Sequence, residues 1–239
     1  MKIIIFGQHP VKDLLSDSSI RVKRVYVKNK NILDDLVKIN KSIRNIDSIK
    51  ISEKDFYDLT KSNSHQGLAV EIETPKLYEY TDFKKNIHEL GRIIVVIDHV
   101  NDPHNLGAII RSCVFFDINT VVIPKNRAAS ITPGSIKSSA GTIFKSTIYE
   151  VPNLKNVLIE LKKKDYWVIG ADIRGENINS AIFDQYMDEK IVLVLGSENK
   201  GISKILKKNC DLIARINNPG NTDSLNVSVA SGIFLNRFS

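Results

Sequence analysis

The chain has 239 residues, of which 42% are hydrophobic and 26% charged, which suits a globular protein of one large domain or two modest ones. The formal net charge of +7 is divided almost evenly between the two halves, so it permits a polyanionic partner but fits a solvated lysine-rich surface equally well. The longest apolar run, Ile93–Ile97, is too short to cross a membrane, which argues against a membrane-spanning protein.

Two further features bear on the cellular compartment. The amino-terminal apolar stretch is too short for a signal peptide, and no small-residue cleavage site follows it. Cys113 and Cys210 have neither the spacing of a metal site nor that of a disulfide framework. We therefore expect buried thiols, no metal and a cytoplasmic location.

Residues 1–75 are predicted to form a small α/β domain. Short β-like runs predict strands at Ile3–Phe6, Val22–Val27 and Leu68–Ile72. Helices are expected at residues 11–15, with a cap near His9-Pro10, at residues 31–39, and after Ser52. Ser52 has the position of a helix cap, with Asp55 three residues later.

Residues 76–90 follow Pro75 in a polar stretch and are predicted to be a linker. From residue 91 to 239 the pattern changes to long apolar runs separated by helical stretches. Strands are expected at residues 93–98, 120–124, 166–170, 191–196 and 212–216, and helices at 106–116, 154–163, 202–208 and 227–237. Such apolar runs are typical of strands covered on both faces, so an α/β domain with a predominantly parallel sheet is predicted.

The carboxyl ends of the predicted strands indicate where a ligand would bind. Open parallel sheets bind ligands at that edge. Three strands end there in polar or glycine-containing turns, at residues 98–105, 196–201 and 217–224. These three turns are the candidate site.

The first turn leads through Asp102 and Pro103, a plausible cap and first-turn pair, into an otherwise apolar helix. Arg111 lies in this helix and is not expected to be buried without a partner. It could bind a phosphate or a carboxylate, or reach solvent at the helix edge. His99 and His104 lack the spacing of helical metal ligands.

The second turn begins at Gly196 and ends at Gly201. A glycine at the end of a strand allows a ligand to approach the backbone closely. Glu198 stands where a dinucleotide fingerprint has its second glycine, which argues against an NAD-type oxidoreductase. An ordinary strand-to-helix turn with Glu near the helix start would give the same pattern.

The third turn carries Ser224, Leu225 and Asn226 into the last apolar helix. Ser224 could cap that helix, which would be a purely structural role. Asn226 is less usual, because an amide between Leu225 and Val227 needs hydrogen-bond partners.

In this order the three turns resemble the motifs of the SpoU (TrmH-type) RNA 2′-O-methyltransferases. The matches are Asn105-x-Gly107-x-x-x-Arg111, Gly196-x-Glu198-x-x-Gly201 and Ser224-Leu225-Asn226-Val227-Ser228. The resemblance continues through residues 122–127 and 139–141. It reaches the amino-terminal domain, where Gly7-x-His9-Pro10-Val11 and His65-Gln66-Gly67 are similar to the family's RNA-binding domain. The most similar subfamily is that of the bacterial 23S rRNA guanosine 2′-O-methyltransferases.

The third motif departs from the family in one place. The family usually has Ile-Pro-Met at its start, whereas this chain has Ile216-Asn217-Asn218, with Pro219 displaced. Ile216, Gly220 and Leu225 keep their spacing. The change falls where the cofactor pocket is expected.

The resemblance implies a SPOUT domain with a C-terminal trefoil knot, a rare exception to the unknotted rule. It implies a homodimer that takes ribosomal RNA as substrate and S-adenosylmethionine as cofactor. The cofactor would be bound near Gly196, Gly201, Ile216, Gly220 and Leu225. Asn105, Glu198, Ser224 and Asn226 would hold the ribose and Arg111, and Arg111 would stabilise the charge that develops on the attacking oxygen.

Two other functions stay open at this point. The chain could methylate the ribose of a tRNA, although its amino-terminal domain favours rRNA, since the tRNA guanosine-18 enzymes generally lack this module. It could also be a catalytically silent RNA-binding protein. Retention of Asn105, Arg111, Glu198 and Asn226 argues against that second alternative, because a binder has no need of the set.

Overall fold

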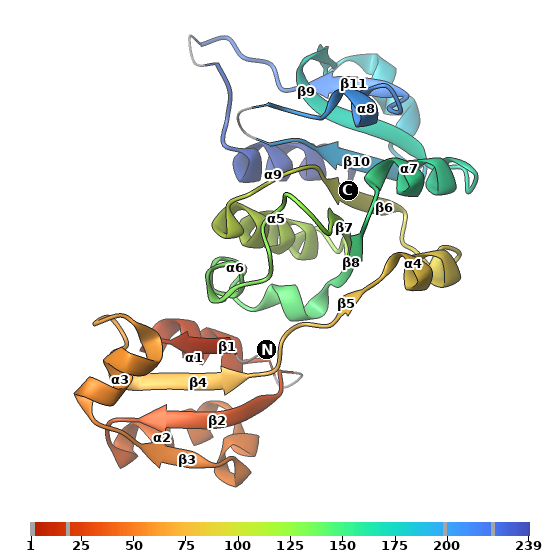
Figure 1. Ribbon diagram of the computed structural model, residues 1–239. Coiled ribbons are helices and arrows are strands. Elements are labelled where there is room, and N and C mark those ends of the chain that lie inside the picture. Colours follow the sequence, from red (N-terminus) through yellow and green to blue (C-terminus); the bar gives the residue numbers. More distant parts are fainter. Residues whose placement is uncertain (1–2, 18–19, 198–199, 221–222) are drawn as a thin grey trace. The chain divides into compact units, whose positions relative to one another are not determined.

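The computed structural model describes residues 3–17, 20–197, 200–220 and 223–239 (Figure 1). The chain divides into two compact units, each with a sheet of its own. The smaller unit comprises Met1–Pro75 and Ile131–Phe144, and the larger comprises Lys76–Ser130 and Lys145–Ser239. Among the described residues, no helix is long and apolar enough to cross a membrane.

The smaller unit contains a four-stranded sheet in the order β1-β4-β2-β3. Its strands are β1 (Ile3–Phe6), β2 (Val22–Val27), β3 (Ser48–Lys50) and β4 (Leu68–Ile72). β4 pairs antiparallel with β1 and β2, and β3 pairs parallel with β2. The helices of residues 1–75 are α1 (Gln8–Leu15), α2 (Lys30–Ile39), the 3-10 helix η1 (Lys41–Asn45) and α3 (Glu53–Thr60).

The caps of these helices test the sequence-based expectations. The capping box of Ser52 and Asp55 at the start of α3 is confirmed, because each side chain bonds the other's backbone amide. The first helix begins earlier than expected: its cap is Gly7, and His9 and Pro10 lie inside the helix. Gly7 has φ +93°, a conformation that glycine adopts without steric cost.

Residues 131–144 were expected in the second domain but group with the smaller unit. They contain α6 (Pro133–Ser138), capped by Thr132, and lead into the 3-10 helix η2 (Thr142–Lys145). α6 contacts β1, and Gly141, with φ +80°, lies against Leu14 and Ile20. Burial of the apolar side chains of Leu14 and Ile20 against this segment explains why the segment packs with the smaller unit.

The larger unit contains a seven-stranded sheet in the order β11-β9-β10-β6-β7-β8-β5. Its strands are β5 (Leu77–Tyr78), β6 (Ile93–Ile97), β7 (Thr120–Pro124), β8 (Thr147–Val151), β9 (Trp167–Asn177), β10 (Ile191–Leu195) and β11 (Leu212–Arg215). Every pair of neighbouring strands is parallel. The predicted parallel sheet is confirmed, and β5 and β8 add two strands that were not expected.

Helices cover both faces of the larger sheet (Figure 1). They are α4 (Tyr80–Asn86), α5 (Pro103–Phe115), α7 (Leu154–Lys162), the 3-10 helix η3 (Ala181–Tyr186), α8 (Lys204–Lys207) and α9 (Val227–Phe238). One apolar core joins α4, α7 and α8 to the central strands. α5 and α9 pack against each other. The guanidinium of Arg92, just before β6, donates to the carbonyl of Phe238 at 2.6 Å and so holds the end of α9.

The predicted linker at residues 76–90 is wrong, because this segment is part of the larger unit. β5 pairs with β8, and α4 packs on β8. Phe83 is fully buried, and its ring meets Tyr149 edge to face at 5.4 Å between centroids. Phe83 and Ile87 are four residues apart and share one buried face of a helical turn. The polar composition of the surrounding residues led to the prediction of a linker instead.

Replacement of Phe83 tests this correction. Phe83→Ala should lower the free energy of unfolding of the larger unit by about 3–5 kcal/mol, since it leaves a cavity in a close-packed core. Trp167, the one tryptophan of the chain, lies in β9 and reports unfolding of this unit by fluorescence in urea. Lys85→Ala, on the exposed side of α4, should change stability by no more than about 0.5 kcal/mol. Equal changes in the free energy of unfolding for the two variants would mean that Phe83 of α4 is not part of the hydrophobic core.

Candidate functional site

The three turns singled out in the sequence lie at one edge of the larger sheet. β6, β10 and β11 all run parallel, so the chain leaves each of them on the same side. β6 and β10 are neighbours, and β11 is joined to them through β9. This edge is the candidate site.

The first turn positions Asn105 and Arg111 on α5. Asp102 caps the helix by accepting a hydrogen bond from the amide of His104 at 2.9 Å, and Pro103 occupies the first turn, as predicted. Asn105 is buried, whereas Arg111 is exposed. Within the part of the chain that the structure describes, Arg111 has no hydrogen bond or ion pair. Its guanidinium is therefore available to an anionic ligand.

The third turn meets the first through a side-chain hydrogen bond. The amide nitrogen of Asn226 donates to the side-chain oxygen of Asn105 at 3.1 Å. The side-chain oxygen of Asn226 accepts from the amide and the hydroxyl of Ser228, at 2.9 and 2.6 Å, and so caps α9. Asn226 thus fixes the start of α9 against α5. The alternative in which Ser224 only caps the helix does not hold, because Asn226 occupies the cap position, and Ser224 and Leu225 are exposed before the helix.

The second turn folds back on itself at Gly196. A Cβ at Gly196 would lie 2.1 Å from the backbone carbon of Gly201 and 2.2 Å from the nitrogen of Ile202, closer than any side chain allows. Ser197 and Gly201 form an isolated bridge, and Gly201 has φ +63°. Both glycines are therefore required by the backbone path. Glu198 lies outside the described residues.

The chain between β11 and α9 is mostly exposed. Ile216 is half-buried, and Gly220 is exposed. The side-chain oxygen of Asn218 accepts from the amide of Gly220 at 3.1 Å, which closes a local Asx turn. The unusual Asn217-Asn218 pair thus contributes a turn-forming side chain where the family has a different sequence.

Two carboxylates at this edge were not predicted. Asp98, directly after β6, is 1% exposed; one of its oxygens contacts Nδ1 of His99 and the other accepts from the amide of Ser203 at 2.7 Å. Asp172, in β9, forms an ion pair of 2.9 Å with Lys207 and accepts from the amide of Arg174 at 3.0 Å. Ser203 and Lys207 are distant in sequence from these two carboxylates, so no local pattern indicates the contacts.

The electrostatics of Asp172 follow from these contacts. Partial burial alone would raise the pKa of this carboxyl, but the hydrogen bonds from Lys207 and from the Arg174 amide outweigh it. The net result is a pKa below the ordinary value of an aspartate. The ionised form is thus stabilised in the folded chain.

The thiols and histidines give no metal site. Burial raises the pKa of Cys113 to about 12 and that of Cys210 to about 12, so both thiols stay protonated at neutral pH. They are free cysteines. No group of three His, Cys, Asp or Glu side chains suited to a metal occurs among the described residues.

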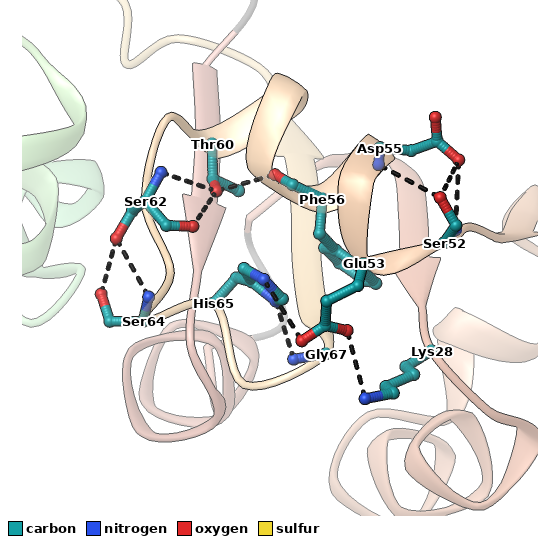
Figure 2. Close-up of polar contacts among 10 residues, drawn as sticks. All are labelled: Lys28, Ser52, Glu53, Asp55, Phe56, Thr60, Ser62, Ser64, His65 and Gly67. Carbon is teal, nitrogen blue, oxygen red and sulfur yellow. Dashed lines mark hydrogen bonds and ion pairs between the residues drawn. The ribbon is translucent and has the colours of Figure 1, made fainter.

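In the His65-Gln66-Gly67 motif of the smaller unit, His65 and Gly67 are buried and take part in a network of polar contacts (Figure 2). The imidazole of His65 is 2% exposed, stacks on Phe56 at 4.6 Å, and accepts at Nδ1 from the amide of Gly67 at 3.1 Å. Its Nε2 lies 3.8 Å from Glu53, which also pairs with Lys28 at 3.1 Å. These contacts give His65 a structural role in shaping the loop.

The paired motif at the start of α1 lies beside this loop. Gln66 accepts from the amide of Gln8 at 2.8 Å, and the amide of Gly7 donates to the carbonyl of Leu68 at 3.0 Å. His9 is exposed. The two motifs of the smaller unit therefore form one connected surface element, with His9 facing solvent.

Comparison with known proteins gives two family matches that together span nearly the whole chain. Residues 92–236 match the model described as "SpoU rRNA Methylase family", and residues 4–78 match "RNA 2'-O ribose methyltransferase substrate binding". The "23S rRNA (guanosine-2'-O-)-methyltransferase RlmB" of Xylella fastidiosa is 32% identical over 237 residues, covering 97% of this chain and 93% of that protein. The protein of the same name from Blochmanniella floridana is 31% identical, covering 98% and 93%.

The fold has matches among solved structures. The SpoU methyltransferase AviRb from Streptomyces viridochromogenes, solved in complex with the cofactor AdoMet, superimposes with a TM-score of 0.76. The alignment covers 99% of this chain and 88% of AviRb at 20% sequence identity. At that identity the likeness concerns the fold.

The low pKa of Asp172 has a measurable consequence. Because the folded-state value is depressed, its contribution to stability is present above the unfolded-state pKa and is lost as the pH falls through the folded-state value. Asp172→Asn should therefore destabilise the larger unit by about 1 kcal/mol at pH 7 and by progressively less in acid. Urea titrations followed by Trp167 fluorescence at several pH values measure this difference.

A second ion pair of the larger unit gives the control. Lys163 and Glu160 are 3.0 Å apart on the surface of α7, so Glu160→Gln should change stability little at any pH. A destabilisation by Asp172→Asn that does not shrink in acid would contradict the electrostatic explanation.

Proposed function

The chain belongs to the SpoU rRNA methylase family, and from that premise we propose which of its residues carry the reaction and on which RNA. It is an S-adenosylmethionine-dependent RNA 2′-O-methyltransferase. Its reaction is methyl transfer to the ribose 2′-hydroxyl of a guanosine in 23S rRNA. The observation that carries the residue assignment is the hydrogen bond between Asn226 and Asn105, since it joins the third motif to the first, and the first motif carries Arg111 on the same helix.

The residues at the sheet edge suit the cofactor. Gly196 and Gly201 lie in the turn that follows β10, and neither carries a side chain. Leu225, which is 46% exposed, offers an apolar side chain just before α9. Gly220 and Ile216 lie on the chain between β11 and α9. We assign to these five residues the binding of S-adenosylmethionine through backbone amides and carbonyls and apolar contact. When bound, this cofactor supplies an electrophilic methyl group on a sulfonium.

Arg111 is assigned the central chemical role. The ribose hydroxyl must lose its proton as it attacks, so negative charge develops on its oxygen. A guanidinium ordinarily keeps its proton in proteins, so Arg111 would stabilise that charge, or the adjacent phosphate, without acting as the base. The proton then leaves to water or to a phosphate oxygen.

The other motif residues orient these groups. Asn105 and Asn226 fix α5 against the start of α9, so they determine where Arg111 is held. Ser224 lies two residues before Asn226 and is exposed, and it is assigned a contact to the ribose. Glu198 is assigned the same role; it lies outside the described residues, and its assignment rests on the family motif. Alignment of nucleophile and methyl group contributes up to about 7–11 kcal/mol in favourable cases.

The smaller unit is assigned the selection of the RNA. Its residues 4–78 match a substrate-binding family, which supports this role. The exposed His9 and the adjoining loop offer a polar surface, and the net charge of +7 is compatible with a polyanion. The proposed domain organisation is therefore an RNA-binding amino-terminal domain followed by a SPOUT catalytic domain. Because the substrate is ribosomal RNA, we place the reaction in the cytoplasm.

The proposal includes a trefoil knot formed by the carboxy-terminal segment, as in the family. Two observations support it. β11 joins the outer edge of the sheet, next to β9, while the chain after it returns to pack α9 on α5. The returning segment must therefore pass the turns that follow β6 and β10.

A homodimer is proposed from the surface of α5 and α9. Phe115 on α5 is 80% exposed, and Val229 and Ile233 on α9 are 53% and 39% exposed. The two helices pack against each other, so these apolar side chains belong to one pair of helices. Exposed aromatic and aliphatic side chains of this kind are typical of subunit interfaces.

The reaction is tested by mapping 2′-O-methyl groups on rRNA and tRNA from cells with and without the gene. One guanosine of 23S rRNA should lose its methyl group in the deletion strain and regain it with the wild-type gene. Arg111→Ala should lower the rate on that RNA by roughly 10²–10³-fold, and Arg111→Lys should restore little, because an ammonium lacks the planar fork.

Lys163→Ala, a surface change on α7, is the control and should leave the rate unchanged. A lost methyl group on a tRNA with unchanged rRNA would make the tRNA alternative correct. No binding of S-adenosylmethionine by calorimetry, with or without RNA, would make the chain a silent RNA-binding protein. Near-normal activity of Arg111→Lys would overturn the bidentate role of Arg111.

The dimer is tested by light scattering of the purified protein. The wild type should have the mass of two chains, and Phe115→Glu should have the mass of one, because it places a charge in the apolar interface. Ile159→Glu, on α7, should leave the mass unchanged. A monomeric wild type would contradict the proposal.

A further inference from the structure

Asp98 is a buried carboxylate that the proposed mechanism does not use. It lies directly after β6 and is 1% exposed. A buried aspartate is costly unless it is paired or accepts hydrogen bonds. Its contacts therefore indicate what it does.

The contacts of Asp98 join two of the three turns. Its backbone amide donates to the carbonyl of Leu195, the last residue of β10, at 2.7 Å. One carboxylate oxygen accepts from the amide of Ser203 at 2.7 Å, at the end of the turn that begins at Gly196. The other oxygen contacts Nδ1 of His99, whose backbone is left-handed with φ +58°. One residue thus holds both ends of the second turn and the start of the first.

The described residues of the second turn are also bonded to one another. Ser197 and Gly201 bond each other, so these contacts define the shape of the turn but not its place. Gly196 is in backbone contact with Gly201 and Ile202, so a displacement of Ser203 is transmitted to Gly196 through Ile202. The hydrogen bond that the Ser203 amide donates to the Asp98 carboxyl is short, at 2.7 Å.

We propose that Asp98 is a positioning residue for the cofactor, fixing the Gly196–Gly201 turn against β6 through the amide of Ser203. This inference rests on the proposed function, because it assumes that the turn binds S-adenosylmethionine. Asp98 acts through the backbone of the turn and not on the reacting atoms. Its removal should weaken cofactor binding and leave RNA binding unchanged.

The experiment compares two carboxylates of the same sheet. Asp211 accepts from the amide of Val168 at 2.9 Å and pairs with Lys162 at 2.7 Å, but it lies before β11, at the opposite edge. Asp98→Ala and Asp211→Ala should both lower the melting temperature, followed by Trp167 fluorescence. Only Asp98→Ala should raise the Kd for S-adenosylmethionine, by roughly tenfold or more, because only Asp98 holds the amide of Ser203 at the end of the Gly196–Gly201 turn.

Two further variants separate positioning from folding. Ser203→Pro removes the donor and keeps Asp98; the φ of Ser203, −57°, already suits proline. It should raise the Kd by a similar factor. Asp98→Asn retains an acceptor oxygen and should restore much of the affinity. The Kd for RNA should stay within about twofold of wild type in all of them, since the smaller unit is untouched.

The outcomes are distinct. A wild-type protein that binds no S-adenosylmethionine would overturn the proposed function and this inference with it. A wild type that binds, together with Asp98→Ala and Ser203→Pro variants that bind equally well, would overturn this inference alone. Equal weakening by Asp211→Ala would also overturn it, because the effect would then be one of general stability. If neither variant folds, Asp98 is a folding determinant and the positioning role is wrong.

Discussion

All seven strands of the larger sheet run parallel, and this one direction decides where the chemistry can take place. A parallel strand must be followed by a crossover, so each loop that leaves a strand is returned to the same edge. The turns after β6, β10 and β11 are thereby brought together although 121 residues separate Asn105 from Asn226. Backbone geometry then refines the edge: Gly196 lets the second turn lie against itself, and Asn226 caps α9 while it bonds α5.

The parts of the fold that could be predicted are those whose cause lies within a few residues. Continuous apolar runs predicted β6, β7, β9, β10 and β11, because strands buried on both faces need them. The capping box at Ser52 and the Asp102-Pro103 helix start depend on neighbours only, and both are present. The prediction of a linker at residues 76–90 was wrong because it relied on the polar composition of the segment and not on the helical spacing of Phe83 and Ile87.

The remainder of the site depends on contacts that are distant in sequence. Nothing near Asp98 in the sequence indicates that it accepts a hydrogen bond from the amide of Ser203. In the same way, nothing near Asp172 indicates its ion pair with Lys207. Residues 131–144 could not be assigned to the smaller unit because Gly141 meets Leu14 only in the folded chain. Arg111 was singled out by its residue type and Asn105 by the family motif, but the bond that orients Asn105 was not foreseeable. Sequence reasoning thus proposed candidate site residues more readily than it proposed the contacts that hold them in place.

The bond between Asn105 and Asn226 also sets the order in which the enzyme can be completed as it is made. Asn105 is synthesised 121 residues before its partner, and during that interval α5 has no α9 to pack against. The third turn of the proposed site is the last to be synthesised, and it meets the first turn only when α9 packs on α5. The proposed site is therefore complete only once the final helix of the chain has folded against α5.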